Sequence, residues 1–314
     1  MKRRRLLLPA AVAALLLAGC GSGGGEPTSS TVEVVATTTV VADLARGVAG
    51  NAADVKQLLQ PNTDAHEYEP RPDDVIAASR ADLVLQSGDQ LDRWAADVVE
   101  QSGTDAPLVD LAKKLRVRRP GETEGDEASR YDPHWWHDPR NVVTAVEEIR
   151  DALAAVDPAA EATYARNAAA YVAQVRTLDA GIAECFAAVP PADRKLVTDH
   201  DAFGYFAGRY GIEVVGAVIP SQTTGAQSSA ADVAALTRVV RREGVKAVFP
   251  ETSLNQKLVQ AVARQAGVSA RYELYGDSLG RAGSPGATYL GMEAANADAM
   301  VRGFTGAKQG CRPR

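Results

Sequence analysis

The stretch "DPAAEATYARNAAAYVAQVRTLDAGIAECFAAV", residues 157–189, predicts one long helix that organises the rest of the chain. Apolar side chains recur along it every three or four positions, as on one helix face, at Tyr164, Ala168, Tyr171, Val175, Leu178 and Ile182. We expect Asp157 to cap its first turn and Pro158 to take the first helical position. Such a helix would be roughly 45 Å long, enough to brace two lobes. A large hinge motion between the lobes is therefore not expected.

Short apolar segments alternate with helical patterns on both sides of this helix. Strands are predicted at 32–38, 54–59, 82–87, 195–199, 213–219 and 246–251, and helices at 40–48, 71–81, 142–156, 230–242 and 254–266. This alternation is typical of βα units with a parallel sheet. The sequence thus predicts an α/β protein with two (β/α) lobes, mainly parallel sheets and a long rigid bridging helix. The lobes are expected at 32–156 and 190–314, on either side of the bridge at 157–189.

The first residues, "MKRRRLLLPAAVAALLLAGC", have the layout of an export signal, expected to cover residues 1–19. Their apolar run is too short for a permanent membrane helix. "LAGC" is similar to the cleavage box of bacterial lipoproteins, so Cys20 is expected to become a lipidated first residue. The Gly/Ser-rich residues 20–31 would be a flexible linker. We expect an exported protein anchored by lipid to the outer face of the cytoplasmic membrane, at the cell surface or in the periplasm.

Charge and cysteine content restrict the partners. Without the signal, 34 − 4 = 30 basic side chains face 40 acidic ones, a net charge of about −10. This balance disfavours nucleic acid and favours cations, and we expect a monomer. An exported compartment also permits Cys185 and Cys311 to form a disulfide.

Three of the four histidines and one aspartate are candidate metal ligands. They lie at or after predicted strands, at the sheet edge where open α/β sheets bind ligands: His66, His134, His200 and Asp277. Three imidazoles and one carboxylate form a tetrahedral N₃O set that suits Zn²⁺. Because histidine ligands must be neutral, affinity is expected to fall below about pH 6.5.

The stretch "DPHWWHDPRN", residues 132–141, contains two histidines three positions apart, His134 and His137. They could chelate one ion together only on a helix. Pro133 and Pro139 disfavour a helix here, so the partners of His134 are expected elsewhere in the chain.

Four protein ligands would leave no open position for water, which favours binding over catalysis. We therefore expect no enzymatic activity. A zinc hydrolase with Asp277 or Glu251 as base is the enzymatic alternative, although the sequence has neither an HExxH helix nor a GxSxG elbow. A surface adhesin is a third alternative, which the predicted lipid tether permits.

Five motifs, "DAHEYEP", "DPHWWHDPRN", "DHDAFGYFAGRYGIEVVG", "ETSLN" and "ELYGDSLG", resemble in order and spacing those of the zinc and manganese solute-binding lipoproteins of ABC transporters. The resemblance implies a receptor that captures Zn²⁺ between two lobes and delivers it to an ABC permease. It also implies that His66, His134, His200 and Asp277 are the ligands. His137 falls where that family commonly has an apolar residue and would be a bystander.

Two departures bear on the choice of metal. Many zinc-specific members carry a histidine-rich loop before the second motif, where this chain has an acidic run, "GETEGDEA", at 121–128. We expect that run to be solvated. Manganese members often have glutamate at the third histidine, so His200 favours zinc, with a Mn²⁺ receptor as the alternative.

Several neighbouring residues are expected to support the ligands. Glu251 would orient a ligand histidine through its second N–H, with an additional oxygen ligand as the alternative. Glu67 would either orient His66 or lie exposed. Trp135 and Trp136 would pack around the site and exclude water. Asp138 is a candidate N-cap.

Overall fold

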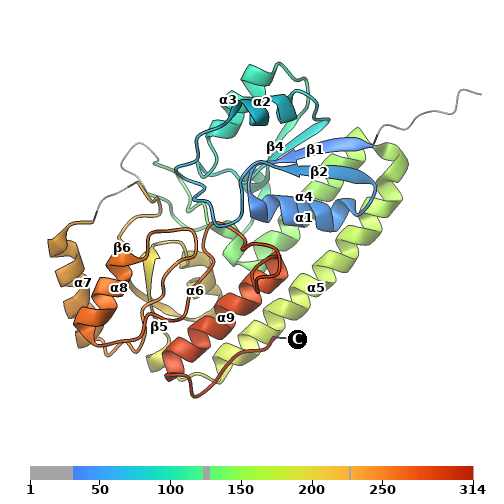
Figure 1. Cartoon of the computed structure of the whole chain (residues 1–314). Helices are drawn as coiled ribbons and strands as arrows, with labels where there is room; N and C mark the ends of the chain where they lie inside the picture. The colour runs from blue at the N-terminus through green and yellow to red at the C-terminus, as the bar shows by residue number, and fades with distance from the viewer. Residues whose placement is uncertain (1–30, 123–127, 226–227, 314) are drawn as a thin grey trace, which may run out of the picture. The chain divides into compact units, whose positions relative to one another are not determined.

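The computed structural model describes residues 31–122, 128–225 and 228–313. The predicted export signal, the lipidation at Cys20 and nearly all of the predicted linker lie outside these ranges. The described chain folds into two parallel α/β regions joined by long helices (Figure 1). This confirms the predicted fold class.

The N-terminal region contains a parallel four-stranded sheet with the strand order β2-β1-β3-β4. Its elements are β1 (Val32–Ala36), α1 (Thr39–Ala49), β2 (Ala53–Gln57), α2 (Pro72–Ala78), β3 (Leu83–Gln86), α3 (Trp94–Ser102) and β4 (Leu108–Asp110). The apolar β1 residues are fully or almost fully buried from Val34 to Ala36, as expected of a strand covered on both faces. The loops after β2 and β3 therefore leave the same edge of the sheet.

Two helices, α4 (Pro139–Val156) and α5 (Glu161–Ala187), form the bridge. The prediction that the long helix begins at Pro158 is wrong by one turn, because residues 158–160 form a separate 3₁₀ turn. The Asp157 side chain accepts a hydrogen bond from the Tyr164 hydroxyl at 2.8 Å instead of capping the helix. Over 27 residues, α5 is still roughly 40 Å long.

The core contacts of α5 explain how it can brace both regions. Its first half, through Val175, packs into the hydrophobic core of the N-terminal region. Its second half, from Leu178 to Phe186, packs into a separate core of the C-terminal region. One rigid helix is therefore part of both cores.

The C-terminal region contains a short parallel sheet and four helices. Its elements are β5 (Lys195–His200), α6 (Gly204–Tyr210), β6 (Glu213–Ile219), α7 (Ala230–Arg242), α8 (Lys257–Ala266) and α9 (Tyr289–Thr305). The prediction of a strand at 246–251 is wrong, because the segment forms only single parallel bridges. These join Phe249 to Thr198 and Glu251 to Leu274. Pro250 has no N–H to donate, which explains why continuous pairing fails there. The segment still brings Glu251 beside the end of β5.

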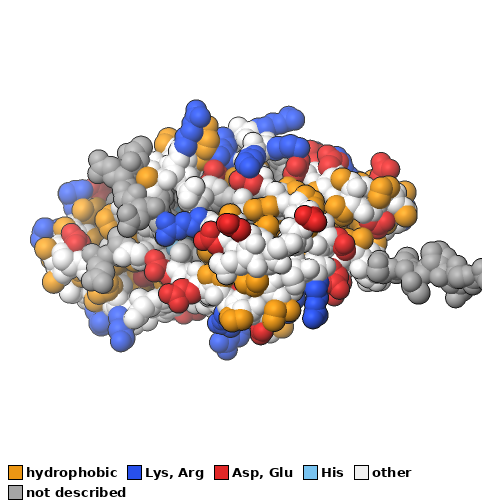
Figure 2. Space-filling model, turned by 90° about the horizontal axis from the view of Figure 1, so that it is seen from above, with side chains coloured by type: hydrophobic (Ala, Val, Ile, Leu, Met, Phe, Trp, Pro, Cys, Tyr) orange, Lys and Arg blue, Asp and Glu red, His pale blue; other side chains and the backbone are white. Residues whose placement is uncertain are grey.

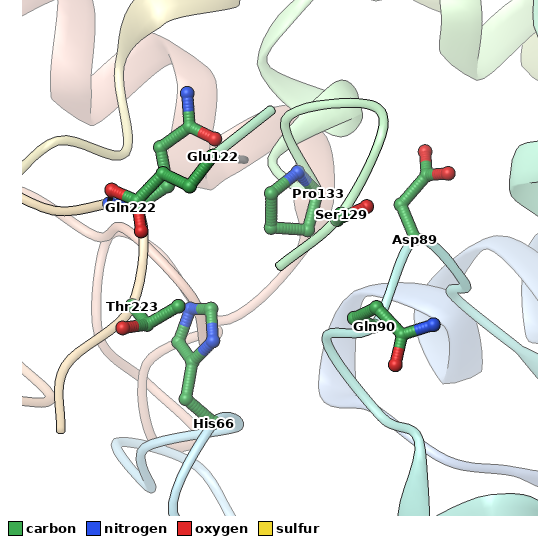
Figure 3. A pocket seen from close by; sticks show the side chains of 8 residues that line it. All are labelled: His66, Asp89, Gln90, Glu122, Ser129, Pro133, Gln222 and Thr223. Carbon is green, nitrogen blue, oxygen red and sulfur yellow. Dashed lines mark hydrogen bonds between the residues drawn. The ribbon is translucent and has the colours of Figure 1, made fainter. Parts of the chain in front are cut away.

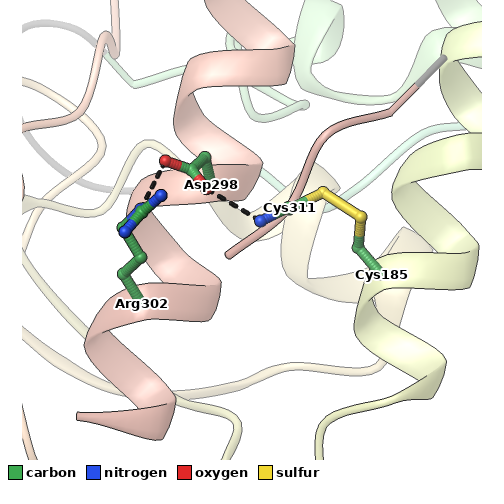
Figure 4. Close-up of a disulfide and its surroundings, with 4 residues drawn as sticks. All are labelled: Cys185, Asp298, Arg302 and Cys311. Carbon is green, nitrogen blue, oxygen red and sulfur yellow. Dashed lines mark hydrogen bonds and ion pairs between the residues drawn. A yellow bond between two sulfur atoms is a disulfide. The ribbon is translucent and has the colours of Figure 1, made fainter. Parts of the chain in front are cut away.

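Cys185, in α5, and Cys311, in the segment after α9, form a disulfide (Figure 4). Asp298 of α9 also fixes this segment, because one carboxylate oxygen accepts a hydrogen bond from the Cys311 backbone N–H at 2.8 Å. Its other oxygen pairs with Arg302 at 2.6 Å. The C-terminal segment is thus held against both α5 and α9.

Within the described ranges, no helix is both long enough and apolar enough to cross a membrane. On the face seen in Figure 2, lysine and arginine side chains are interspersed with aspartate and glutamate. That mixed distribution differs from the clustered basic surfaces that bind nucleic acid.

We predict that replacing both Cys185 and Cys311 with serine lowers the free energy of unfolding by about 2–5 kcal/mol, because the disulfide closes a long loop in the unfolded chain. Denaturant titration of the variant and the oxidised wild type measures the difference. A reductant should lower the stability of the wild type only. Equal stabilities of the oxidised wild type and the variant would contradict the prediction.

Candidate metal site

Four buried side chains from distant parts of the chain converge on one point. Each offers one ligand atom, and these atoms all lie within 4.8 Å of one another. The four residues are His66, His134, His200 and Asp277, each at most 8 % exposed. The structure thus brings together the four residues selected from the sequence, whereas His137 lies outside this group.

Each of the four residues is delivered by a different loop or strand end. His66 lies in the loop between β2 and α2, and His200 is the last residue of β5. His134 immediately precedes a 3₁₀ turn, Trp135–His137, that leads into α4. Asp277 lies in the loop between α8 and α9. The group therefore lies where the carboxyl ends of the parallel strands open, the usual ligand position in such sheets.

Three distances, all measured from His134 Nε2, match those between the ligands of a tetrahedral ion. His134 Nε2 lies 3.3 Å from both His66 Nε2 and His200 Nε2. The same atom is 3.3 Å from Asp277 Oδ1. Ligands about 2.0–2.1 Å from a central Zn²⁺ at tetrahedral angles would be about 3.3–3.4 Å apart. The donor set and the spacing around His134 therefore fit a zinc ion, whereas Asp277 lies farther from His200 and His66, at 3.5 and 4.0 Å.

Carboxylates fix the ring orientation of two histidines. His134 Nδ1 lies 2.8 Å from Asp132 Oδ1, and His200 Nδ1 lies 3.0 Å from Glu251 Oε1. Each carboxylate also accepts a hydrogen bond from the backbone N–H of the same histidine, at 3.0 and 2.9 Å. A proton held on Nδ1 leaves the Nε2 lone pair directed at the shared point. The interaction expected of Glu251 is thus present in the structure.

Asp132 is the residue that the sequence analysis missed. A local signal was available, because an aspartate two residues before His134 can accept a hydrogen bond from that residue's backbone N–H. Glu67, in contrast, is exposed, and its carboxylate lies against Gly225. Of the acidic run at 121–128, residues 123–127 lie outside the described ranges. Glu122 accepts hydrogen bonds from Ser221 and Gln222.

Asp277 gives the site its negative charge. It is fully buried, and neither of its carboxylate oxygens has a hydrogen-bond partner among the described residues. Burial alone would raise the pKa of Asp277, but His200 and His134 outweigh burial and hold that pKa well below its usual range. A buried, ionised carboxylate that faces only imidazole nitrogens requires a nearby cation, either a metal ion or a protonated imidazole.

The histidine pKa values respond to the same charge. Burial lowers the pKa of His134, but Asp132 and Asp277 outweigh burial and raise it to about 9. Burial also opposes ionisation of His200, whose pKa Glu251 and Asp277 nevertheless raise well above its usual range. Without an ion, protons on the imidazoles balance Asp277. An incoming metal ion must displace these protons. The pH below which metal affinity is expected to fall therefore lies above 6.5.

Both tryptophans of the 132–141 stretch are buried beside the site and donate hydrogen bonds. Trp135 Nε1 lies 3.2 Å from the Ser87 carbonyl oxygen, in the loop after β3. Trp136 Nε1 lies 3.1 Å from the carbonyl oxygen of Gly276, the neighbour of Asp277. Asp138 caps α4, because its carboxylate accepts a hydrogen bond from the Arg140 N–H at 3.0 Å. The tryptophans thus tie the His134 loop to two other loops.

His66 also borders a small pocket at the surface. Figure 3 shows Thr223 beside His66, with Pro133 across the opening and Asp89 and Gln90 on the opposite wall. Within the described chain, His66 is the one member of the four that lines this pocket. His66 is also the one of the four with any exposure, at 8 %, whereas the other three are fully buried.

Comparisons with known proteins agree with this arrangement. The family described as zinc-uptake complex component A, periplasmic, matches residues 34–303. The iron-binding protein YfeA of Yersinia pestis is 32% identical over 268 residues, 84% of each protein. The manganese-binding lipoprotein MntA of Halalkalibacterium halodurans is 30% identical over 266 residues, 85% of this chain and 86% of that protein.

The solved structure of the periplasmic zinc-binding protein TroA from Treponema pallidum superposes with a TM-score of 0.80 at 29% identity. The match covers 88% of this chain and 99% of that one. The chain belongs to the family of zinc and manganese solute-binding lipoproteins of metal ABC transporters. Members of this family are substrate-binding proteins rather than enzymes.

We predict that the metal-free protein loses stability as pH rises from 6.5 to 9. The pKa of His134 is raised from 6.5 to about 9, so its protonation stabilises the folded state fully below pH 6.5. This contribution, on the order of 3 kcal/mol, disappears as pH rises through 9. Denaturant unfolding in the presence of a chelator measures it.

The matched variant for that measurement is Asp132→Asn, which keeps the shape of the side chain and removes its charge. We expect the variant to show a shallower pH dependence and a lower His134 pKa by NMR titration. Identical pH profiles for variant and wild type would contradict the assigned role of Asp132.

Proposed function

We propose that this protein is an extracytoplasmic receptor that captures Zn²⁺ and delivers it to an ABC permease for uptake. His66, His134, His200 and Asp277 hold the ion in this proposal. Asp132 and Glu251 orient two of the histidines. The receptor acts outside the cytoplasmic membrane, to which lipidated Cys20 would anchor it, and it works as a monomer.

The observation that carries the proposal is the buried Asp277 carboxylate, which lacks hydrogen-bond partners in the described chain and lies within 4.0 Å of three imidazole nitrogens. A divalent cation satisfies all four groups at once. Four protein ligands fill a tetrahedral shell and leave no position for a reactive water. Binding is therefore better supported than hydrolysis.

The choice of zinc is supported by the donor atoms. Three imidazole nitrogens suit Zn²⁺, whereas Mn²⁺ prefers more oxygen donors and a larger coordination number. Three relatives are named as iron-binding, manganese-binding and zinc-binding proteins. Mn²⁺ remains the competing cargo, because both Asp277 oxygens face the imidazoles and could coordinate together.

Release is proposed to occur through loop movement rather than by separation of the lobes. The bridging helix α5 belongs to both hydrophobic cores, which opposes a wide opening. His66 lies in a loop and borders the surface pocket, so its displacement would open the shell first. The loop that carries Asp277 is the second candidate.

We predict that alanine at His66, His134, His200 or Asp277 weakens Zn²⁺ binding by more than about 100-fold, since even outer-shell losses cost 10–100-fold. Calorimetry with chelator-stripped protein measures the affinity. Glu67→Gln is the matched control and should keep the wild-type value, because Glu67 is exposed. The proposal fails if the wild type shows no tight binding or if the four variants retain its affinity.

Competition with Mn²⁺ and Fe²⁺, followed by elemental analysis, tests the choice of metal. We expect Zn²⁺ to be retained. If the protein retained Mn²⁺ against an excess of Zn²⁺, the transported ion would be Mn²⁺, and the proposal of a metal receptor would still hold.

We predict that Zn²⁺ affinity rises with pH from 6 to about 9, because the metal displaces protons from imidazoles whose pKa values are raised. Each displaced proton adds about tenfold in affinity per pH unit below the pKa. Calorimetry in buffers of different ionisation enthalpy counts the released protons. An affinity that does not change between pH 7 and 9 would contradict the assigned protonation.

A further inference from the structure

Helix α9 carries a row of buried polar side chains that the proposed metal shell does not use. Tyr289, Glu293 and Asn296 are spaced by four and three residues and so lie on one face of the helix. All three are fully buried. Buried polar groups of this kind require partners, and their partners come from two loops that each carry a proposed ligand.

The first two side chains hold the loop of His134. The Tyr289 hydroxyl donates a hydrogen bond to the Trp136 carbonyl oxygen at 3.0 Å. His137 Nδ1 lies 2.8 Å from Glu293 Oε1, with both residues fully buried. The His137 ring also stacks on Phe203, with a centroid distance of 4.6 Å and an interplanar angle of 28°. The residues that follow His134 are thus fixed from two sides.

The third side chain holds the loop of Asp277. Asn296 accepts a hydrogen bond from the Tyr275 N–H at 2.8 Å and donates one to the Tyr275 carbonyl oxygen at 2.9 Å. This pair of bonds fixes the backbone two residues before Asp277. The bond from Trp136 Nε1 to the Gly276 carbonyl oxygen then joins the two loops directly.

We infer that this row of side chains on α9 sets the distance between His134 and Asp277. Glu293 is a positioning residue that acts through His137. The fixed distance in turn sets the metal preference of the site. The inference rests on the proposed function. A helix is rigid over two turns, so two loops bound to one helix face keep a fixed separation. Since Zn²⁺ and Mn²⁺ differ in bond length and coordination number, a fixed separation favours one over the other.

The His137–Glu293 pair is suited to this role rather than to stabilising the fold. Among the described residues, His137 Nε2 and Glu293 Oε2 have no hydrogen-bond partner, so the pair is incompletely satisfied. Replacing a buried pair with apolar side chains of similar volume is often neutral or stabilising. Such a replacement should therefore separate positioning from folding.

The test compares the wild type with a His137→Leu/Glu293→Leu double variant. Titration with Co²⁺, followed by visible absorption, reports the coordination geometry, and competition titrations give the ratio of Zn²⁺ to Mn²⁺ affinity. We expect an altered Co²⁺ spectrum and a Zn²⁺/Mn²⁺ ratio at least about fivefold lower, with the metal-free melting temperature nearly unchanged. An unchanged spectrum and ratio would overturn the inference.

Two further variants make the outcome decisive. Tyr164→Phe removes a part-buried hydrogen bond to Asp157 at the α4–α5 junction and should leave the Co²⁺ spectrum and the Zn²⁺/Mn²⁺ ratio unchanged. Glu293→Gln keeps the side-chain shape and replaces the double variant in the test if the double variant does not fold. An unchanged ratio of Zn²⁺ to Mn²⁺ affinity in this variant would then overturn the inference. A wild type that binds none of these metals would refute the proposed function, whereas unchanged variants beside a metal-binding wild type refute the positioning role alone.

Discussion

The buried carboxylate of Asp277 is the constraint on which the architecture around the site depends. An isolated ionised carboxylate in a protein interior costs several kcal/mol unless a cation compensates for it. Hydrogen-bond donors would supply that compensation at an ordinary buried aspartate, and here three imidazoles face it instead. Their protonation and the binding of a metal ion are alternative ways to neutralise one charge. Two further carboxylates, Asp132 and Glu251, set which imidazole nitrogen faces it.

The surrounding frame keeps these groups together without a flexible connection between the lobes. The Asp43 carboxylate of α1 accepts hydrogen bonds from the Tyr171 hydroxyl of α5 and from the Tyr289 N–H at the start of α9. Three helices are thereby joined at one oxygen atom. Helix α5 continues from this junction into the second core, and the disulfide fixes its far end to the C-terminal segment. Helix α9 also holds the loops of His134 and Asp277, so the loop of His66 is the part that is proposed to move first.

Much of this fold follows from local patterns in the sequence. The helix at 230–242 and the strand at 213–219 have the predicted bounds, because a capping box at Ser229 and an unbroken apolar run define them. The three histidines of the candidate site stand out because the chain has only four histidines, and Asp277 follows from the motif "ELYGDSLG". The prediction of a strand at 246–251 was wrong because it was based on the apolar pattern alone. Pro250 fits that pattern but has no N–H for strand pairing. The pairing of His137 with Glu293 spans 156 positions, and no local pattern encodes a contact of that separation.

The four residues of the site are spread over most of the folded chain, from the loop after β2 to the loop before α9. An incomplete or partly unfolded chain cannot assemble them, so the proposed cargo would bind only the finished fold. By mass action, a free ion at 100 times its dissociation constant would then add about 2.7 kcal/mol to the stability of the native state. The loaded receptor would resist proteolysis better than the empty one. Supply of the ion would in this way set how long each receptor molecule survives.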